Sequence, residues 1–347
     1  MPNPFDNNNP NQISMILDSL KEKPRIIQLT QCVNEETLIE PCLKQVADKV
    51  DQVICIHGAV QSKVNAGQAT PDGKSLDRTG EILERLQEDP LLKDKLLVIE
   101  IGRPWQNLEE LKNAFLSYLR PGDYILILDA DEFIHPDTVD KLRETIDTQP
   151  LVNEIVPVFY HFWKDKYHIK SPNDFANFGV QHQRFVKFEP GMHYRNHPVL
   201  TNIAGHCTYF SQHKWPFRFT CDWFGIYHYS YMNFKREELL AKKKFYDVEL
   251  GQAKHGFVGA AERDYTMNEF LNYTEKEDSL LIFDKDHPSI IQTEPWFGQL
   301  DEKLTPKSFK HFSQEKPYSY TPKEMPLIYN TMIKIQQMPL FINPLDD

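Results

Sequence analysis

The chain has 347 residues, 40% of them hydrophobic and 12% aromatic, which suits one large or two modest domains with a packed core. Its formal net charge of −11 argues against a protein that binds nucleic acid by bulk electrostatics, because such binding needs a basic surface. The sequence shows no apolar run as long as a membrane span, and we expect no signal peptide at its polar start. We interpret the five widely spaced cysteines as reduced thiols of a cytoplasmic protein, without a zinc site.

After a polar tail over residues 1–24, the first half of the chain alternates strand and helix patterns. Continuous apolar runs predict buried strands over residues 25–33, 52–59, 96–102 and 123–130. Helical spacing of apolar residues predicts helices over residues 34–50, 75–87 and 107–119, and the polar stretch 60–74 is typical of a long loop. This alternation predicts an α/β fold with right-handed crossovers and a mostly parallel sheet.

The second half of the chain lacks this regular alternation. Strand patterns occur over residues 154–163, 182–189 and 225–232 without helices between them. A helix pattern over residues 234–251 ends at Gly251, which we interpret as its C′ residue. Beyond about residue 255 the chain is polar and broken by prolines, and we expect helices and loops that pack around the core.

Three carboxylates follow the fourth predicted strand directly: Asp129, Asp131 and Glu132. One interpretation is an ordinary solvated strand end before a helix that begins near Pro136. The other is a ligand site, because open parallel sheets bind ligands beyond the carboxyl ends of their strands. Asp129 and Asp131 are at i and i+2, so in an extended chain they point to the same side with Cα atoms about 6.5–7 Å apart. Oxygen ligands so placed suit Mg²⁺ or Mn²⁺ that also holds phosphate oxygens.

Several other nucleotide and catalytic motifs are missing from the sequence. It contains no G-x-G-x-x-G after the first strand and no G-x-x-x-x-G-K-[ST], which weighs against an NAD-type Rossmann domain and a P-loop. It also contains no G-x-S-x-G and no H-E-x-x-H. A metal-assisted diphosphate site is therefore the leading interpretation.

Four segments, in this order, resemble the GT-A fold glycosyltransferases of the family 2 type. They are "TQCVNEETLIEPCL" (30–43), "SLDRTGEIL" (75–83), "WQNLEELKNAFLSYLRPGDYILILDADEFI" (105–134) and "GIYHYSY" (225–231), the third ending in a "DADE" form of the D-x-D motif. The resemblance covers residues 25 to 251. It implies a Rossmann-like nucleotide-diphospho-sugar transferase sandwich, with a mostly parallel central sheet, helices on both faces and a C-terminal helical and loop extension.

The same resemblance implies a domain division and an activity. Residues 25–235 would be the catalytic domain, with a nucleotide-binding half over 25–135 and an acceptor half over 136–235, and residues 236–347 would be the extension. The activity would be that of a metal-dependent hexosyltransferase, which moves a sugar from a nucleotide-diphosphate donor to a hydroxyl acceptor. UDP is the family's commonest carrier.

The resemblance also assigns donor-binding residues. They are Thr30, Gln31, Asn34, Glu35, His57, Asp77, Lys112, Asn113, Asp129, Ala130 and Glu132. The sequence departs from the family at His57-Gly58, where the family usually has an acidic residue, so the identity of the base stays open. Lys112-Asn113 stand where the family often shows Arg-Asn, and a solvated helix face is the other interpretation of this pair.

Metal ligands and a catalytic base complete the expected site. The resemblance implies a Mn²⁺ or Mg²⁺ ion held by Asp129, Asp131 and His228, although a half-buried structural histidine is the alternative for His228. The family's His-Glu pair reads His197-Pro198 here, so the expected acid is missing. The candidates for the base are therefore His197, Glu189 and Asp222, and the sequence does not choose between inversion and retention.

Aromatic clusters over residues 159–168 and 222–234 fit core packing, but Trp163, Trp223 and Tyr229 could form a platform for an acceptor sugar. The expected partners are a nucleotide-sugar donor and a glycan, glycolipid or small hydroxyl acceptor, with no nucleic acid and no transmembrane segment. A homo-oligomer is left open, as is a peripheral position at the inner membrane face. A non-catalytic nucleotide-sugar binder and a nucleotidyltransferase are the alternative functions.

Overall fold

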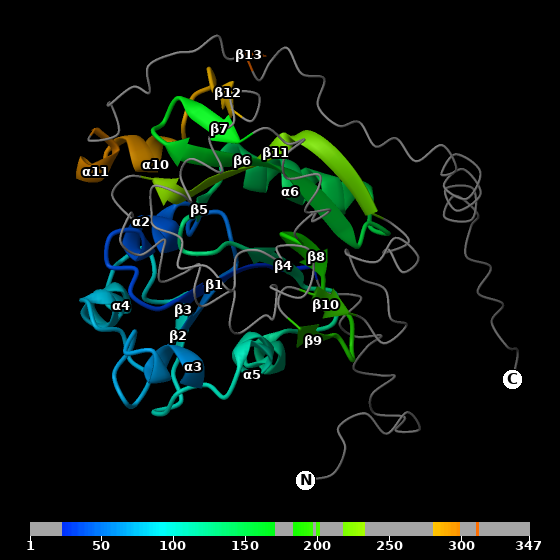
Figure 1. Cartoon of the computed structure of the whole chain (residues 1–347). Coiled ribbons are helices and arrows are strands. Elements are labelled where there is room, and N and C mark those ends of the chain that lie inside the picture. Colours follow the sequence, from blue (N-terminus) through cyan, green and yellow to red (C-terminus); the bar gives the residue numbers. More distant parts are fainter. Residues whose placement is uncertain are drawn as a thin grey trace, which may run out of the picture. The chain divides into compact units, whose positions relative to one another are not determined.

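Four parallel strands form the centre of the fold, as the sequence predicts. In the computed structural model β1 (Ile26–Cys32), β2 (Gln52–His57), β3 (Leu96–Ile99) and β4 (Tyr124–Ile127) lie in the order β3-β2-β1-β4 (Figure 1). The structure describes residues 23–170, 183–196, 199–201, 218–232, 280–298 and 310–311. The chain divides into two units, 1–315 and 316–347, and every described residue belongs to the first.

Strand β1 shows why both faces of this sheet are buried. Ile26 packs in one hydrophobic cluster and its neighbour Ile27 packs in another, as the alternation of side chains along a strand requires. The first cluster includes apolar side chains of α2 (Ile39–Lys44), α4 (Thr79–Leu86) and α6 (Asp137–Thr148), and the second includes Leu111 of α5 (Leu108–Asn113). The predicted α/β sandwich with helices on both faces is confirmed.

The helices of this half are shorter than their sequence patterns predict. The pattern over residues 34–50 gives only α2, in which Pro41 is the third residue and needs no backbone donor. The pattern over residues 107–119 breaks into α5 and a 3₁₀ turn, Leu116–Tyr118. The prediction of a continuous loop over residues 60–74 is wrong, because Val60 accepts backbone bonds that open the short helix α3 (Gln61–Asn65).

The second half of the chain extends the sheet with mixed strand directions. Strand β8 (Phe185–Lys187) lies antiparallel between β4 and β6 (Glu154–Lys164), and β11 (Arg218–Met232) runs parallel to β6. The two-residue strand β5 (Glu132–Phe133) pairs antiparallel with β11. Strands β9 (His193–Asn196) and β10 (Val199–Thr201) form a separate pair. The strands predicted over 154–163, 182–189 and 225–232 are confirmed.

The region beyond residue 255 contributes strands as well as the expected helices. β12 (Leu280–Ile282) pairs antiparallel with β7 (His168–Lys170) and parallel with β13 (Lys310–His311), because the apolar run that includes Leu281 buries itself against the sheet. The short helices α10 (Ser289–Gln292) and α11 (Pro295–Gly298) follow. The helix predicted over residues 234–251, with Gly251, lies outside the described residues. Within the described part of the chain, helices are all too short or too polar to cross a bilayer.

His287 is packed among aromatic rings in this region. Its ring lies 4.8 Å from Phe162 and 5.0 Å from Phe297, centroid to centroid. Its Nδ1 is 2.6 Å from the Tyr229 hydroxyl and its Nε2 is 3.0 Å from the Lys166 carbonyl oxygen. The carbonyl can only accept, so Nε2 carries the proton and Nδ1 accepts from the Tyr229 O–H. A neutral ring is thereby fully bonded, and burial lowers the pKa of His287 to about 4.

This histidine is expected to make the protein less stable in mild acid. Its pKa is 6.5 in the unfolded chain and about 4 in the folded one, so the unfolded chain binds the extra proton between these values. Stability present above pH 6.5 is lost as the pH falls to about 4, by about 3 kcal/mol at 1.36 kcal/mol per pKa unit. Urea unfolding of the wild type and of His287→Asn across this pH range measures it. In His287→Asn the free energy of unfolding should depend less on pH over this range, whereas His135→Asn, which changes an exposed histidine, should keep the dependence of the wild type. An equal pH dependence in all three proteins would contradict the assignment of this effect to His287.

Candidate active site

The three carboxylates lie in a tight turn at the carboxyl end of β4. The Leu128 amide donates to the Leu29 carbonyl of β1 at 2.9 Å, and the Glu132 amide donates to the Asp129 carbonyl at 2.9 Å. Glu132 then opens β5, where it stands opposite His228 of β11. The acidic turn is therefore held between the parallel strands and the strand that carries the predicted histidine.

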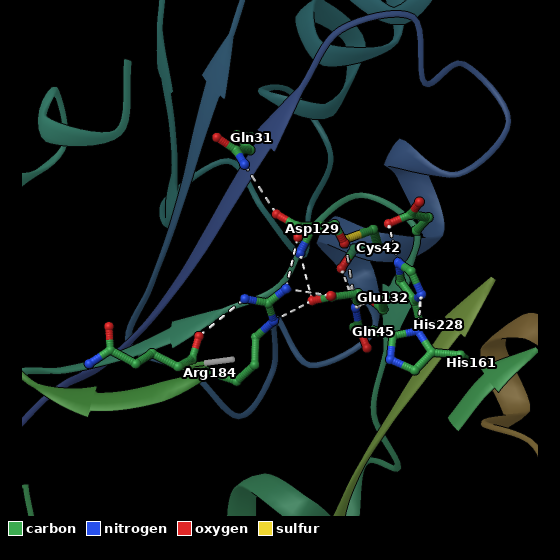
Figure 2. Close-up of polar contacts among 10 residues, drawn as sticks. Gln31, Cys42, Gln45, Asp129, Glu132, His161, Arg184 and His228 are labelled. Carbon is green, nitrogen blue, oxygen red and sulfur yellow. Dashed lines mark hydrogen bonds and ion pairs between the residues drawn. The ribbon is translucent and has the colours of Figure 1, made fainter. Parts of the chain in front are cut away.

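Arg184, directly before β8, joins two of the acids. Its Nε donates to Glu132 Oε2 at 2.7 Å, while Nη2 donates to Glu132 Oε1 at 2.5 Å and to Asp129 Oδ2 at 2.8 Å (Figure 2). The guanidinium carbon also lies 5.3 Å from the centre of the Phe159 ring. Glu132 is 1% exposed and Arg184 is 6% exposed, so this is a buried two-point ion pair. The sequence analysis missed Arg184; the only signal was a charged residue opening an apolar strand.

The acids outnumber this arginine. The pKa of Glu132 is raised to about 7, chiefly by burial; Arg184 lowers it, and the nearby Asp129 and Asp131 contribute to the rise. Burial of Arg184 favours its neutral form, but the two carboxylates it contacts hold its pKa above the ordinary value. The cluster therefore carries an excess of negative charge, which a cation would relieve.

Asp131 lies beside His228 rather than beside Arg184. Its Oδ1 is 3.6 Å from His228 Nε2, and its backbone carbonyl accepts from the Tyr229 amide at 2.9 Å. The other ring nitrogen of His228, Nδ1, is 2.8 Å from Nδ1 of His161 on β6 (Figure 2). Asp131 is 3% exposed, so its carboxylate is buried, whereas the side chain of His228 is 13% exposed.

These contacts bear on the expected Mn²⁺ or Mg²⁺ site. Among the described residues, histidine, cysteine and acidic side chains nowhere gather in a group of three that could hold an ion. Both oxygens of Asp129 already accept hydrogen bonds, Oδ1 from Gln31 at 3.2 Å and Oδ2 from Arg184. Asp131 and His228 fit an ion that keeps one or two protein ligands and completes its shell with water and phosphate oxygens.

Asn34 and Glu35, after β1, and Asp77, before α4, form hydrogen bonds that join these two parts of the chain. The Asn34 side chain donates to the Gln68 carbonyl at 2.8 Å and accepts from the Leu76 amide at 2.7 Å, with Asn34 at φ 57°. Asp77 Oδ2 accepts from the Glu36 amide at 3.0 Å, and the Glu35 amide donates to the Thr79 hydroxyl at 2.7 Å. The loop after β1 is thereby tied to the start of α4.

Other predicted donor residues fall into two groups. Thr30 and Ala130 are 1% and 3% exposed and pack inside, so the structure does not bring their side chains to an open site. His57, at the end of β2, is also buried; its Nδ1 lies 2.6 Å from Glu100 Oε1 and its Nε2 lies 2.9 Å from the Ser75 hydroxyl. Gln31 does reach the acidic turn, through its bond to Asp129.

Lys112 and Asn113, on α5, face β9. Asn113 brackets the backbone of Tyr194, accepting from its amide at 2.7 Å and donating to its carbonyl at 3.0 Å. The Lys112 ammonium lies 5.3 Å from the centre of the Tyr194 ring, and the described residues offer it no hydrogen-bond acceptor. Burial lowers the pKa of Lys112 to about 8, while the charge of Asp129 raises it. A buried cation so placed is suited to an anionic ligand.

The base and platform candidates are placed only in part. Glu189 is half-buried in the turn after β8, whereas His197 and the side chains of Asp222 and Trp163 lie outside the described residues. Trp223 is half-buried. The prediction that Tyr229 is open to an acceptor is wrong: the side chain is 0% exposed, and its ring stacks on Phe162 at 4.8 Å.

Residues 71–214 match the family model described as Glycosyl transferase family 2. This segment is a family 2 glycosyl transferase segment. The match includes the acidic turn, α5 and Arg184, but it begins after β1 and ends before His228. The match agrees with the resemblance of the sequence to this family. No curated protein matches the chain.

Three solved structures are similar to part of the chain at low identity. They are TarS 1-349 of S. aureus (18% identity, TM-score 0.29, 39% of this chain and 35% of that one), glucosyl-3-phosphoglycerate synthase of M. tuberculosis (15%, 0.31, 50% and 60%) and a structure titled mannose-6-phosphate isomerase from Helicobacter pylori (13%, 0.27, 43% and 56%). The chain thus spans between about a third and three fifths of these solved chains. With TM-scores this low, these similarities support no conclusion about the function of this chain.

Proposed function

We propose that the protein is a metal-dependent glycosyltransferase that moves a sugar from a nucleotide-diphosphate donor, a UDP-sugar by expectation, to a hydroxyl acceptor of a glycan, glycolipid or small molecule. The observation that supports this most is the pairing of Asp131 with His228 of β11, next to an Asp129 that Arg184 holds. The two aspartates follow the carboxyl end of β4, inside the segment that matches family 2. A ligand is expected at this edge of an open parallel sheet.

The roles of the residues follow from their contacts. Asp131 and His228 would hold Mn²⁺ or Mg²⁺, which when bound supplies positive charge to the donor's diphosphate. Gln31, near the end of β1, is bonded to Asp129, which follows β4, and the two side chains can donate hydrogen bonds to the donor's hydroxyls and accept from them. Lys112 adds a buried positive charge toward the phosphates or the departing nucleotide. The base remains one of Glu189, His197 and Asp222.

The rest of the chain fits a support for this site. We take residues 25–235 as the catalytic domain and residues 236–347 as an extension; the pairing of β12 with β7 supports an extension that packs on the core. The cysteines of the described part, Cys32, Cys42, Cys55 and Cys221, are free thiols, which suits the cytoplasm, with access to an acceptor at the inner membrane face.

The test is isothermal titration of UDP, with GDP as the control nucleotide, in the presence and absence of Mn²⁺. We expect UDP to bind at least about tenfold more tightly with Mn²⁺, and Asp131→Ala to abolish that gain, because the variant removes a first ligand of the ion. Asp137→Ala, which removes an exposed carboxylate on α6, is the matched control and should keep it.

Two results would count against the proposal. Binding that ignores both Mn²⁺ and Asp131 would leave a non-catalytic nucleotide-sugar binder as the better interpretation. Release of pyrophosphate from a nucleoside triphosphate and a sugar phosphate would indicate a nucleotidyltransferase instead.

A further inference from the structure

His161 is a buried histidine outside every role assigned so far. It lies on β6 directly opposite His228 of β11, and the two Nδ1 atoms are 2.8 Å apart. The rings meet edge to face, at 4.7 Å between centroids and 86° between planes, and the other side of His161 stacks on Phe159 at 5.2 Å and 14°. His161 is 9% exposed. Its ring is therefore fixed by packing on one side and by His228 on the other.

A distance of 2.8 Å between two ring nitrogens is a hydrogen bond with one proton. Two lone pairs, or two N–H groups, would repel at that separation, so one Nδ1 donates and the other accepts. If His161 donated, His228 would carry its own proton on Nε2, facing Asp131. That atom is 3.6 Å from Asp131 Oδ1, and a ring nitrogen that carries a proton cannot bind the divalent cation that the proposed function places there. If His228 donates, its Nε2 presents a lone pair toward Asp131.

We infer that His161 is a positioning residue: it accepts the Nδ1–H of His228 and so holds the bare Nε2 of His228 beside Asp131, ready to bind a divalent cation. The cation itself rests on the proposed function. Metal-binding histidines are commonly held in this way by an acceptor on the far ring nitrogen, which fixes both the tautomer and the ring angle. Strand pairing places the backbone of residue 228 between residues 132 and 161. It does not set the angle or the tautomer of the ring, which the bond to His161 sets.

Two substitutions separate the hydrogen bond from the packing. His161→Phe keeps an aromatic ring on Phe159 but has no acceptor, whereas His161→Asn places a carbonyl oxygen near the former Nδ1. The readout is the Mn²⁺ affinity in the presence of UDP, from the electron paramagnetic resonance signal of free Mn²⁺, which needs no turnover. We expect His161→Phe to weaken Mn²⁺ binding by about 10–100-fold and His161→Asn to restore most of it.

A double substitution checks that His161 acts through His228. His228→Ala should weaken Mn²⁺ binding, and adding His161→Phe to it should weaken it no further, because the pair acts as a unit. Additive losses, or Mn²⁺ binding by His161→Phe that equals that of the wild type, would overturn the inference while leaving the proposed function standing.

Nitrogen-15 NMR of the metal-free protein reports the tautomer itself. The spectrum of the wild type should show His228 with its proton on Nδ1, and that of His161→Phe should lose this preference. A proton on Nε2 in the wild type would refute the inference, even where His161→Phe fails to fold. If the wild type binds no Mn²⁺, the proposed function is contradicted instead. The spectrum of the metal-free protein still shows which tautomer His228 adopts.

Discussion

Replacing Arg184 by methionine is expected to destabilise the protein by about 3–5 kcal/mol, the cost of leaving a buried charge without its partner. Methionine keeps most of the length and apolar volume of the side chain but provides no donor. Glu132 would lose both of its bonds to the guanidinium and Asp129 would lose one. Since Glu132 is 1% exposed, water cannot replace those bonds without opening the turn.

Urea unfolding at pH 7.5 measures this loss, and two further variants make it specific. Arg78→Met removes an arginine that is 73% exposed and paired with Glu36, so it should change stability by less than about 1 kcal/mol. The double variant Arg184→Met with Glu132→Met should recover part of the loss, because it removes the stranded carboxylate as well. A loss below about 1 kcal/mol in Arg184→Met would show that the pair contributes little.

The parallel half of the fold could be predicted because its signals are local. The strands that became β1, β2, β3 and β4 are continuous apolar runs, and each is followed by a helix pattern, so both the class and the buried faces follow from the sequence. The helix ends were less predictable. The helix predicted from residue 34 begins only at Ile39, because Asn34 turns to φ 57° and bonds to the loop that precedes α4, a contact 42 residues away.

The second half resisted prediction because its order is set by distant pairing. Nothing in the apolar spacing says that β8 runs antiparallel between β4 and β6, or that β11 returns parallel to β6. β12 was missed for the same reason, since its three residues form a strand only where β7 offers an edge.

The sequence predicted the acidic residues of the candidate site but not which partner each of them contacts. The spacing of Asp129 and Asp131 suggested two ligands of one ion. The contacts separate them: Asp129 faces Arg184, 55 residues later, and Asp131 faces His228, almost a hundred residues later. Side chains brought from β8, β6 and β11 decide these pairings, and their separation in sequence leaves no periodic signal. Residue roles for donor and acceptor remain predictions.

Asp131→Asn is expected to lower sugar transfer by about 100–1000-fold. The substitution keeps the size of the side chain and one oxygen but removes the charge that would balance a divalent ion. A bound ion supplies several kcal/mol of charge stabilisation, and each 1.36 kcal/mol is tenfold in rate. The loss should appear in kcat as well as in KM, because charge on the leaving nucleotide grows as its bond to the sugar breaks.

The measurement is release of UDP from a panel of UDP-sugars with Mn²⁺ present, first as slow hydrolysis and then with hydroxyl acceptors. Asp137→Asn makes the same chemical change on a carboxylate that is 69% exposed, so its rate should stay near that of the wild type. Turnover by Asp131→Asn within about threefold of the wild type would mean that its carboxylate does not act on the departing nucleotide, since threefold is well under 1 kcal/mol. A cation held elsewhere, or none, would then have to balance the diphosphate, and the excess negative charge around Arg184 would be a feature of the fold rather than of catalysis.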